Sequence, residues 1–151
     1  MSDKLVRMLS TWFYVGDIPG APGTAASAVA VLMAVILSPY IFLYIVVSVI
    51  ITVLGFKVSG KMEDVLGRKD PGCVVIDEVA GIMVTFFLLP LTIPVVITAF
   101  FLFRAFDMFK IYPANKFEQI KGGTGIMMDD VIAGLYANIV MQIAVRWAGV
   151  I

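Results

Sequence analysis

Three long stretches of the chain carry no charged side chain. Asp, Glu, Lys and Arg are absent from residues 18–56, 79–103 and 131–145. Uncharged runs of this length are typical of membrane segments, because an ionised side chain in the hydrocarbon layer is costly. The length of 151 residues suits one domain, 1–151, and 61% of the residues are hydrophobic, more than in ordinary soluble domains. The sequence therefore predicts a single, all-α, membrane-embedded domain.

The charged residues gather in three polar segments, 3–17, 57–78 and 104–130, which hold ten of the eleven Lys and Arg residues. Two apolar runs separate these segments. If each run crossed the bilayer once, successive polar segments would face opposite sides, whereas runs that cross twice as hairpins leave all three on one side. The hairpin arrangement agrees with the positive-inside rule, which places Lys and Arg in the cytoplasm. We therefore expect a multi-pass membrane protein whose polar side faces the cytoplasm.

Each apolar run contains residues that can break a helix. The first has "LSPY" near its middle, and the second has Pro90 and Pro94. The resulting pieces lie near residues 24–37, 40–57, 76–89 and 94–109. Their lengths of about 21 to 27 Å are slightly short for a hydrocarbon core of about 30 Å. We expect a polytopic bundle of short, proline-broken transmembrane helices, with a single kinked helix across 79–103 as the alternative, because membrane helices tolerate proline.

The first fifteen residues are charged but amphipathic. Leu5, Met8, Leu9, Trp12 and Phe13 would share one face of a helix. No unbroken apolar stretch followed by a small-residue cleavage site is present, so we expect this segment to be retained. The pattern predicts an N-terminal interfacial helix.

Two pairs of adjacent acids stand in similar sequence frames at the polar edge of apolar stretches. Asp77 and Glu78 begin "DEVAG", and Asp129 and Asp130 begin "DDVIAG". Carboxylates at such an edge need a partner, a cation or water, and the small residues that follow allow another helix to approach. The alternative is a structural role, since acids are favourable at helix N-termini. Oxygen ligands without histidine or a thiolate cluster are those that Mg²⁺ prefers.

A third element is "FRAFDMFKIYP", in which Arg104, Asp107 and Lys110 are spaced three residues apart. This spacing places them on one stripe of a helix. A ladder of salt bridges within the helix is one interpretation. In the functional interpretation, Asp107 adds a metal ligand, while Arg104 and Lys110 bind an anion such as phosphate.

Two glycine-rich loops precede predicted helices. "GDIPGAPGTAAS" contains Thr24, and "GGTG" contains Gly123 and Thr124. Exposed backbone N–H groups at a helix start can bind phosphate, although a simple flexible turn is the ordinary interpretation. Lys69, in the second polar segment, is a further candidate for binding phosphate oxygens.

Several kinds of chemistry are excluded by what the sequence lacks. The chain has no histidine, which removes imidazole bases, phosphohistidine and histidine metal ligands. A Cys-x5-Arg phosphatase loop is absent, because residue 79, six after Cys73, is valine, and no nucleotide-binding P-loop is present. The net charge is zero, so no nucleic-acid partner is expected.

With these segments assembled, the chain resembles the bacterial phosphatidylglycerophosphatase A family. Four blocks carry the resemblance, in the family's order and spacing: "PGAPGT" at Pro19–Thr24, "DPGCVVIDEVAG" at Asp70–Gly81, "FRAFDMFKIYP" at Phe103–Pro113 and "GGTGIMMDDVIAG" at Gly122–Gly134. The resemblance implies an all-α, Mg²⁺-dependent enzyme of the bacterial inner membrane. It would hydrolyse the membrane lipid phosphatidylglycerophosphate to phosphatidylglycerol and inorganic phosphate, with its active site facing the cytoplasm.

The resemblance also implies roles for the residues in these blocks. The catalytic and metal-binding set is Asp77, Glu78, Asp107, Asp129 and Asp130, and the substrate-binding set is Thr24, Lys69, Arg104, Lys110, Gly123 and Thr124. Which acid is nucleophile, base or pure ligand stays open.

Two other functional classes would also place carboxylates at membrane helix ends. One is an ion-coupled transporter or channel. The other is a head-group transferase of the CDP-alcohol type, whose typical "DGxxAR" block is absent from this chain. The sequence is also compatible with a homo-oligomer.

Overall fold

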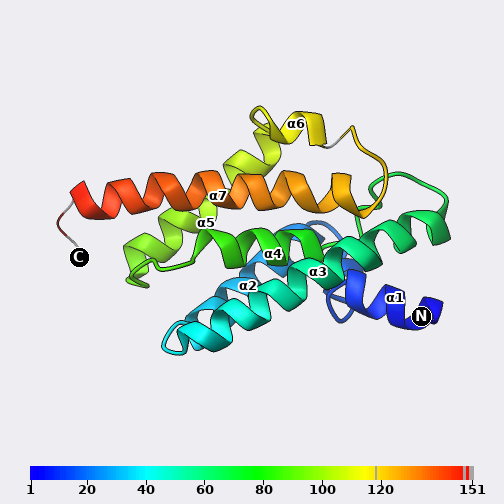
Figure 1. Ribbon diagram of the computed structural model, residues 1–151, viewed down its shortest axis with the longest axis horizontal. Coiled ribbons are helices and arrows are strands. Elements are labelled where there is room, and N and C mark those ends of the chain that lie inside the picture. The colour runs from blue at the N-terminus through cyan, green and yellow to red at the C-terminus, as the bar shows by residue number, and fades with distance from the viewer. Residues whose placement is uncertain (118, 148, 150–151) are drawn as a thin grey trace.

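The computed structural model describes residues 1–117, 119–147 and 149, and across these residues the chain is helical and contains no strand (Figure 1). In chain order the elements are α1 (Asp3–Ser10), the 3-10 turn η1 (Val15–Asp17), α2 (Pro22–Leu37), α3 (Ile41–Leu66), α4 (Ile76–Thr85), α5 (Ile93–Phe109), α6 (Ala114–Phe117) and α7 (Gly123–Trp147). The all-α prediction is confirmed.

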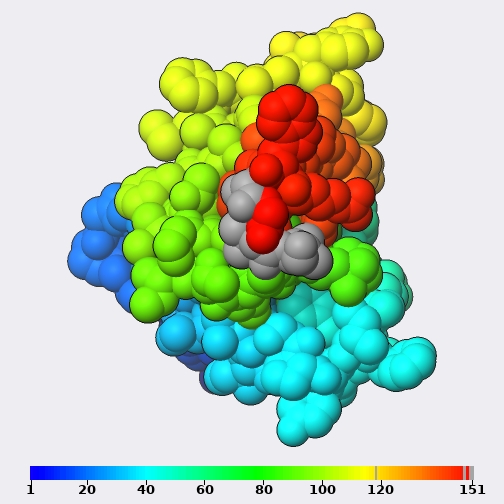
Figure 2. Space-filling view, turned by 90° about the vertical axis from the view of Figure 1, so that its left-hand side faces the viewer, coloured from blue at the N-terminus to red at the C-terminus, as the bar shows by residue number. Residues whose placement is uncertain are grey.

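Helix α7 runs along the molecule and packs against α3, α4 and α5. Figure 1 shows α4 between α7 and α3, with α1 at the end of the molecule where α7 begins. Figure 2 shows the opposite end, where the last turns of α7 (red) lie above the α4–α5 connection (green) and the α2–α3 turn (cyan) lies below it. The starts of α4 and α7 therefore lie at one end of the molecule, and the two hairpin turns lie at the other.

Both predicted helix breaks are present. Helix α2 stops at Leu37 and α3 begins at Ile41, while α4 stops at Thr85 and α5 begins at Ile93. Pro94 lies in the first turn of α5, where a missing N–H group leaves no helical hydrogen bond unmade. The alternative of one kinked helix across 79–103 is therefore wrong.

Helix α4 ends earlier than expected, and side chains of α7 hold its end. The Asn138 amide donates to the carbonyl oxygens of Thr85 (2.9 Å) and Phe87 (2.8 Å). The Gln142 amide donates to those of Phe87 and Leu88, both at 3.2 Å. These bonds satisfy carbonyl groups that a helix end leaves without intrahelical partners.

Among the residues that the structure describes, two helices are long and apolar enough to cross a membrane: α3, with 26 residues, and α7, with 25 residues. Helix α2 has 16 residues and α4 has 10, which correspond to about 24 Å and 15 Å. Both lengths fall below the roughly 30 Å of a hydrocarbon core. The helix lengths thus make a membrane protein plausible, with α3 and α7 as its candidate spans.

The predicted N-terminal helix is shorter than expected. It ends at Ser10, and Trp12 and Phe13 do not continue its apolar face, because they adopt left-handed φ angles of 48° and 56°. The Thr11 hydroxyl donates a hydrogen bond to the Arg7 carbonyl oxygen at 2.8 Å and accepts one from the Tyr14 N–H group. Such side-chain bonds compete with the helical pattern and end the helix.

Candidate metal centre

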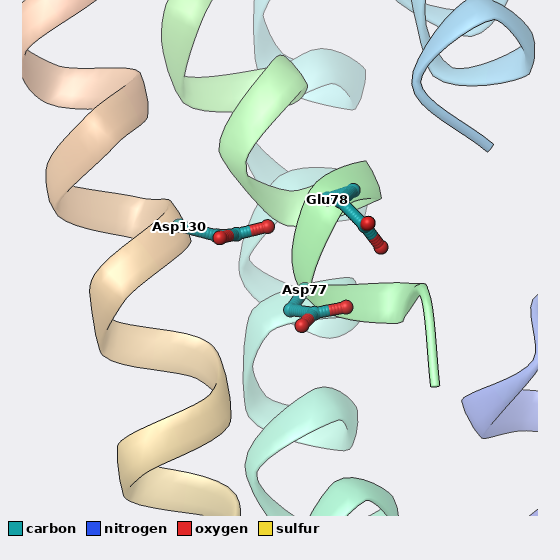
Figure 3. A group of neighbouring side chains, drawn as sticks. All are labelled: Asp77, Glu78 and Asp130. Atoms are coloured by element: carbon teal, nitrogen blue, oxygen red, sulfur yellow. The ribbon is translucent and has the colours of Figure 1, made fainter. Parts of the chain in front are cut away.

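Three carboxylates meet where the start of α4 faces α7. Asp77 and Glu78 lie in the first turn of α4, and Asp130 projects towards them from α7 (Figure 3). One carboxylate oxygen from each residue lies within 4.8 Å of the other two. Asp77 and Asp130 are 8% and 3% exposed, so this cluster is almost closed to solvent. We call these three residues the acid cluster.

The acid cluster contains oxygens that the protein itself leaves unsatisfied. Asp77 Oδ1, Glu78 Oε2 and Asp130 Oδ2 are buried and accept no hydrogen bond from any residue that the structure describes. Burying carboxylate oxygens without partners is costly, whereas a cation between them would satisfy all three. An oxygen-only donor set from two helices suits a hard divalent ion such as Mg²⁺.

The electrostatics of α4 lead to the same conclusion. Asp77 and Glu78 lie outside α3 and α7, the two helices long enough to span a membrane. Burial raises the pKa of the Asp77 carboxyl, and the neighbouring Glu78 carboxylate raises it further. Burial also raises the pKa of Glu78 to about 7, although the charge of Arg104 opposes this shift. Two adjacent buried carboxyls therefore resist full ionisation unless a positive charge joins them.

Asp107 joins the site through an arginine. Arg104 Nη1 lies 2.8 Å from Asp107 Oδ2, which confirms that the two residues share a stripe of α5. The same nitrogen is 3.8 Å from Glu78 Oε1. Asp107 is therefore linked to the acid cluster by the guanidinium group and is not one of its three members.

Asp129 is not a member of the acid cluster and pairs with a lysine. Lys110 Nζ lies 2.8 Å from Asp129 Oδ2, and Lys110 itself ends α5 with a left-handed φ of 44°. Asp129 Oδ1 accepts the Asp130 backbone N–H at 3.1 Å. Lys69 and Asp70 line a small cavity beside Asp129. One acid of this pair thus enters the acid cluster while the other contacts neighbours, whereas both Asp77 and Glu78 enter it.

The start of α2 reaches the acid cluster from another side. A Cβ atom on Gly23 would overlap the Glu78 carboxylate and would lie 3.6 Å from Arg104 Nη1. Only glycine allows the α2 backbone this close. Thr24 follows as an exposed residue in the first turn of α2, so the predicted phosphate-binding loop does lie at the acid cluster.

The second glycine-rich loop has a packing role. A Cβ atom on Gly123 would overlap the Phe56 carbonyl oxygen of α3, and the Gly122 N–H donates to Glu63 at 2.8 Å. Thr124 is exposed and precedes Asp129 by five residues, about 7.5 Å along the helix. Sequence reasoning missed the contact with Glu63, because 59 residues separate the two positions and no motif links them.

The lysines of two polar segments lie together. Lys69 and Lys121 line one surface cavity with Glu63, although an apolar run separates them in the sequence. The chain therefore leaves this end of the molecule after Glu78 and returns to it before Arg104, as a hairpin requires.

Comparison with known proteins identifies relatives over most of the chain. The family model described as phosphatidylglycerophosphatase A matches residues 8–145. Proteins named phosphatidylglycerophosphatase A from Haemophilus influenzae and Escherichia coli are 33% and 32% identical, with 94% and 93% of this chain and 90% and 84% of those proteins covered. A Bacteroides thetaiotaomicron protein, provisionally named as a phosphatidylinositol-3-phosphatase, is 36% identical over 93% of this chain and 92% of its own. No solved structure matches the chain significantly.

Proposed function

The chain belongs to the phosphatidylglycerophosphatase A family, and on that premise we propose that its acid cluster is the catalytic centre of a lipid phosphatase. The enzyme hydrolyses the terminal phosphate monoester of phosphatidylglycerophosphate to give phosphatidylglycerol and inorganic phosphate. We place the catalytic centre here because carboxylate oxygens of Asp77, Glu78 and Asp130 lie within 4.8 Å of one another.

Asp77, Glu78 and Asp130 are the residues that would hold Mg²⁺. When bound, the ion would neutralise charge that builds up on the transferring phosphoryl group. Asp107 and Asp129 complete the acidic set at its edge, where Arg104 and Lys110 hold them at 2.8 Å. The unsatisfied oxygens of the acid cluster support this assignment, because they offer an ion ligands that no other described group occupies.

The substrate phosphate would lie between Arg104 and the start of α2. Arg104 is only 20% exposed and stands beside both Glu78 and Gly23, so its N–H groups can reach a phosphate oxygen at the acid cluster. Thr24 adds a hydroxyl and backbone N–H groups of the first α2 turn. We propose four further contacts to the substrate, farther from the acid cluster and on the α7 side: Lys69, Lys110, Gly123 and Thr124.

We assign proton transfer to a carboxylate, because the chain has no histidine and carboxylates form the centre of the site. In hydrolysis by water, an acid of the cluster takes the water proton while the water oxygen attacks phosphorus and the bond to the glycerol oxygen breaks. In the alternative route a carboxylate attacks phosphorus first, and water then releases the phosphate. The glycerol oxygen gains a proton in both routes.

We place the protein in the bacterial inner membrane as a multi-pass protein, with the acid cluster towards the cytoplasm. Helices α3 and α7 supply two spans of sufficient length. Lys69 and Lys121 lie near the polar ends of these helices, and the positive-inside rule favours such lysines in the cytoplasm. The lipid substrate would then meet the acid cluster at the membrane surface.

The test is phosphate release by purified protein from phosphatidylglycerophosphate in mixed micelles, with Mg²⁺ or with excess chelator. We expect release only with Mg²⁺, and little release from phosphatidylinositol 3-phosphate, the substrate class in the name of the Bacteroides relative. An Asp130→Asn protein serves as the matched inactive control. Ion flux without hydrolysis would favour the transporter, and a requirement for a CMP-linked lipid would favour the transferase.

A further inference from the structure

We propose that residues 10–17 form a positioning clamp that sets the start of α4, with Thr11 as its central residue. This inference rests on the proposed function, since the start of α4 carries Asp77 and Glu78. The clamp comprises the end of α1, the left-handed turn at residues 12–14 and η1. Its residues are not members of the acid cluster, so they act on the reaction through the segment that they hold.

The clamp contacts the chain directly before α4. The Val75 N–H donates to the Ser10 carbonyl oxygen at 2.9 Å. A Cβ atom on Gly16 would overlap the Cys73 carbonyl oxygen, so the two backbones are in direct contact. Val75 precedes Asp77 by two residues and is the N-cap residue of α4. A shift of the clamp would therefore move the first turn of α4 relative to Asp130.

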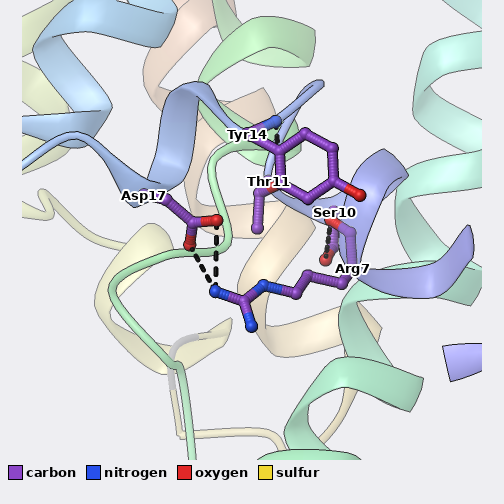
Figure 4. A network of polar contacts seen from close by, with 5 residues as sticks. All are labelled: Arg7, Ser10, Thr11, Tyr14 and Asp17. Carbon is purple, nitrogen blue, oxygen red and sulfur yellow. Dashed lines mark hydrogen bonds and ion pairs between the residues drawn. The ribbon is translucent and has the colours of Figure 1, made fainter. Parts of the chain in front are cut away.

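The shape of the clamp depends on bonds made by Thr11. Trp12, Phe13 and Tyr14 have φ angles of 48°, 56° and 69°, a left-handed run that non-glycine residues adopt only at a cost in free energy. The buried Thr11 hydroxyl donates to the Arg7 carbonyl at 2.8 Å and accepts the Tyr14 N–H at 3.1 Å (Figure 4). The Thr11 carbonyl accepts the Gly16 N–H at 2.8 Å. Thr11 thus links α1, the turn and η1.

An ion pair closes the clamp on its outer side. Arg7 Nη2 lies 3.1 Å and 3.2 Å from the two oxygens of Asp17, which joins α1 to η1 across the turn (Figure 4). The pair is partly exposed, and exposed pairs contribute little. We therefore assign the larger part of the positioning to Thr11 and a smaller part to Arg7.

Cys73, the single cysteine, provides a direct readout of the clamp. Its side chain is partly buried and its backbone carbonyl lies against Gly16, so loosening of the clamp should free this segment and expose the thiol. We would measure maleimide alkylation of Cys73 in purified, Mg²⁺-free protein. Thr11→Val keeps the side-chain shape but removes both hydroxyl bonds. We expect alkylation at least about tenfold faster, since one lost hydrogen bond alone is worth up to about tenfold. Thr11→Ser keeps the hydroxyl and should alkylate as the wild type does.

The catalytic readout separates positioning from general stability. Thr11→Val should lower kcat about tenfold with KM changed less than about twofold, and Thr11→Ser should restore kcat. Lys4→Ala, on the exposed side of α1, is the matched control and should change neither alkylation nor kcat. Unchanged Cys73 alkylation in Thr11→Val would overturn the proposal, as would a fall in kcat that the serine variant does not restore.

A second variant covers the case in which Thr11→Val does not fold. Arg7→Ala should speed Cys73 alkylation about twofold to threefold, and the reversed pair Arg7→Asp with Asp17→Arg should return it to the wild-type rate. Equal rates in all of these proteins would contradict the clamp. Because alkylation needs no substrate, failure of the proposed function would show separately, as absence of phosphate release by the wild type.

Discussion

Gly134 of α7 lies directly against the backbone carbonyl of Gly81 of α4, and each glycine follows an acid of the cluster, Asp130 or Asp77, by four residues. A Cβ atom on Gly134 would overlap the Gly81 carbonyl oxygen, and one on Gly81 would lie 2.8 Å from the Asp130 carbonyl oxygen. Because neither glycine has a side chain, α4 and α7 can pack with their backbones in contact. This close packing also determines the distance between the acids on the two helices.

Gly134→Ala should separate α4 from α7. We expect the free energy of unfolding to fall by about 1–3 kcal/mol, the usual cost of overpacking. Because Asp130 moves with α7, kcat should fall at least about tenfold. Gly72→Ala is the control, since an added Cβ there would meet no atom within 4 Å. Steady-state kinetics and denaturant unfolding of both variants check this, and wild-type kcat in Gly134→Ala would contradict it.

Neutralising an acid should abolish turnover without unfolding the protein. We expect Asp77→Asn, Asp107→Asn and Asp130→Asn each to lower kcat by roughly a hundredfold or more, the scale of losing a charge-stabilising group. The stability of Asp77→Asn and Asp130→Asn should hold or rise, because removing one buried carboxylate relieves repulsion among the others. Asp107→Asn should lose a little stability, because Arg104 loses its ion-pair partner. Asp64→Asn, an exposed acid in the same half of the molecule, should behave as the wild type. Near-normal turnover in all three site variants would place the catalytic centre elsewhere.

Mg²⁺ should stabilise the folded protein. An ion at a hundred times its Kd adds about 2.7 kcal/mol to folding, which corresponds to a Tm rise of about 5–10 °C for a chain of this size. A thermal unfolding series with increasing Mg²⁺ measures the shift without any substrate. Asp130→Asn should show less than half of the wild-type shift. Equal shifts in the two proteins would mean that Mg²⁺ binds outside the acid cluster.

The polar ends of the hairpins should all face the cytoplasm. In a Cys73→Ser background, single cysteines at Lys61, Lys69, Lys116 and Lys121 should resist a membrane-impermeant maleimide in intact cells and react after permeabilisation. Lys69 and Lys121 line one cavity, so they must react from the same side. Labelling of one of these two from outside while the other stays protected would exclude the hairpin topology.

The local features of this fold are readable from the sequence. Proline positions mark the breaks beyond Leu37 and Thr85, since proline restricts its own backbone and that of the residue before it. The two acid pairs with their small-residue partners mark the α4–α7 contact, because a carboxylate at an apolar edge needs a partner and glycine allows close approach.

The features that sequence analysis misses are tertiary. The Gly122 contact with Glu63 and the Arg7–Asp17 pair join elements through geometry that no local pattern encodes. The apolar periodicity of the N-terminus predicts a helix through Phe13, yet side-chain bonds of Thr11 end the helix earlier. Local propensity yields to such bonds, and only the folded arrangement shows which bonds form.

The early end of α4 explains why α7, a mainly apolar helix, carries the polar side chains of Asn138 and Gln142. They donate hydrogen bonds to the carbonyl groups of Thr85, Phe87 and Leu88, which would need such partners if this end of the molecule lay in a bilayer. Leucine at both positions would raise the hydropathy of α7. The carbonyl groups in the turn between α4 and α5 would then lose their hydrogen-bond donors. In a bilayer, the polar atoms that lower the hydropathy of α7 would thus allow the neighbouring chain to turn back without leaving these carbonyl groups unpaired.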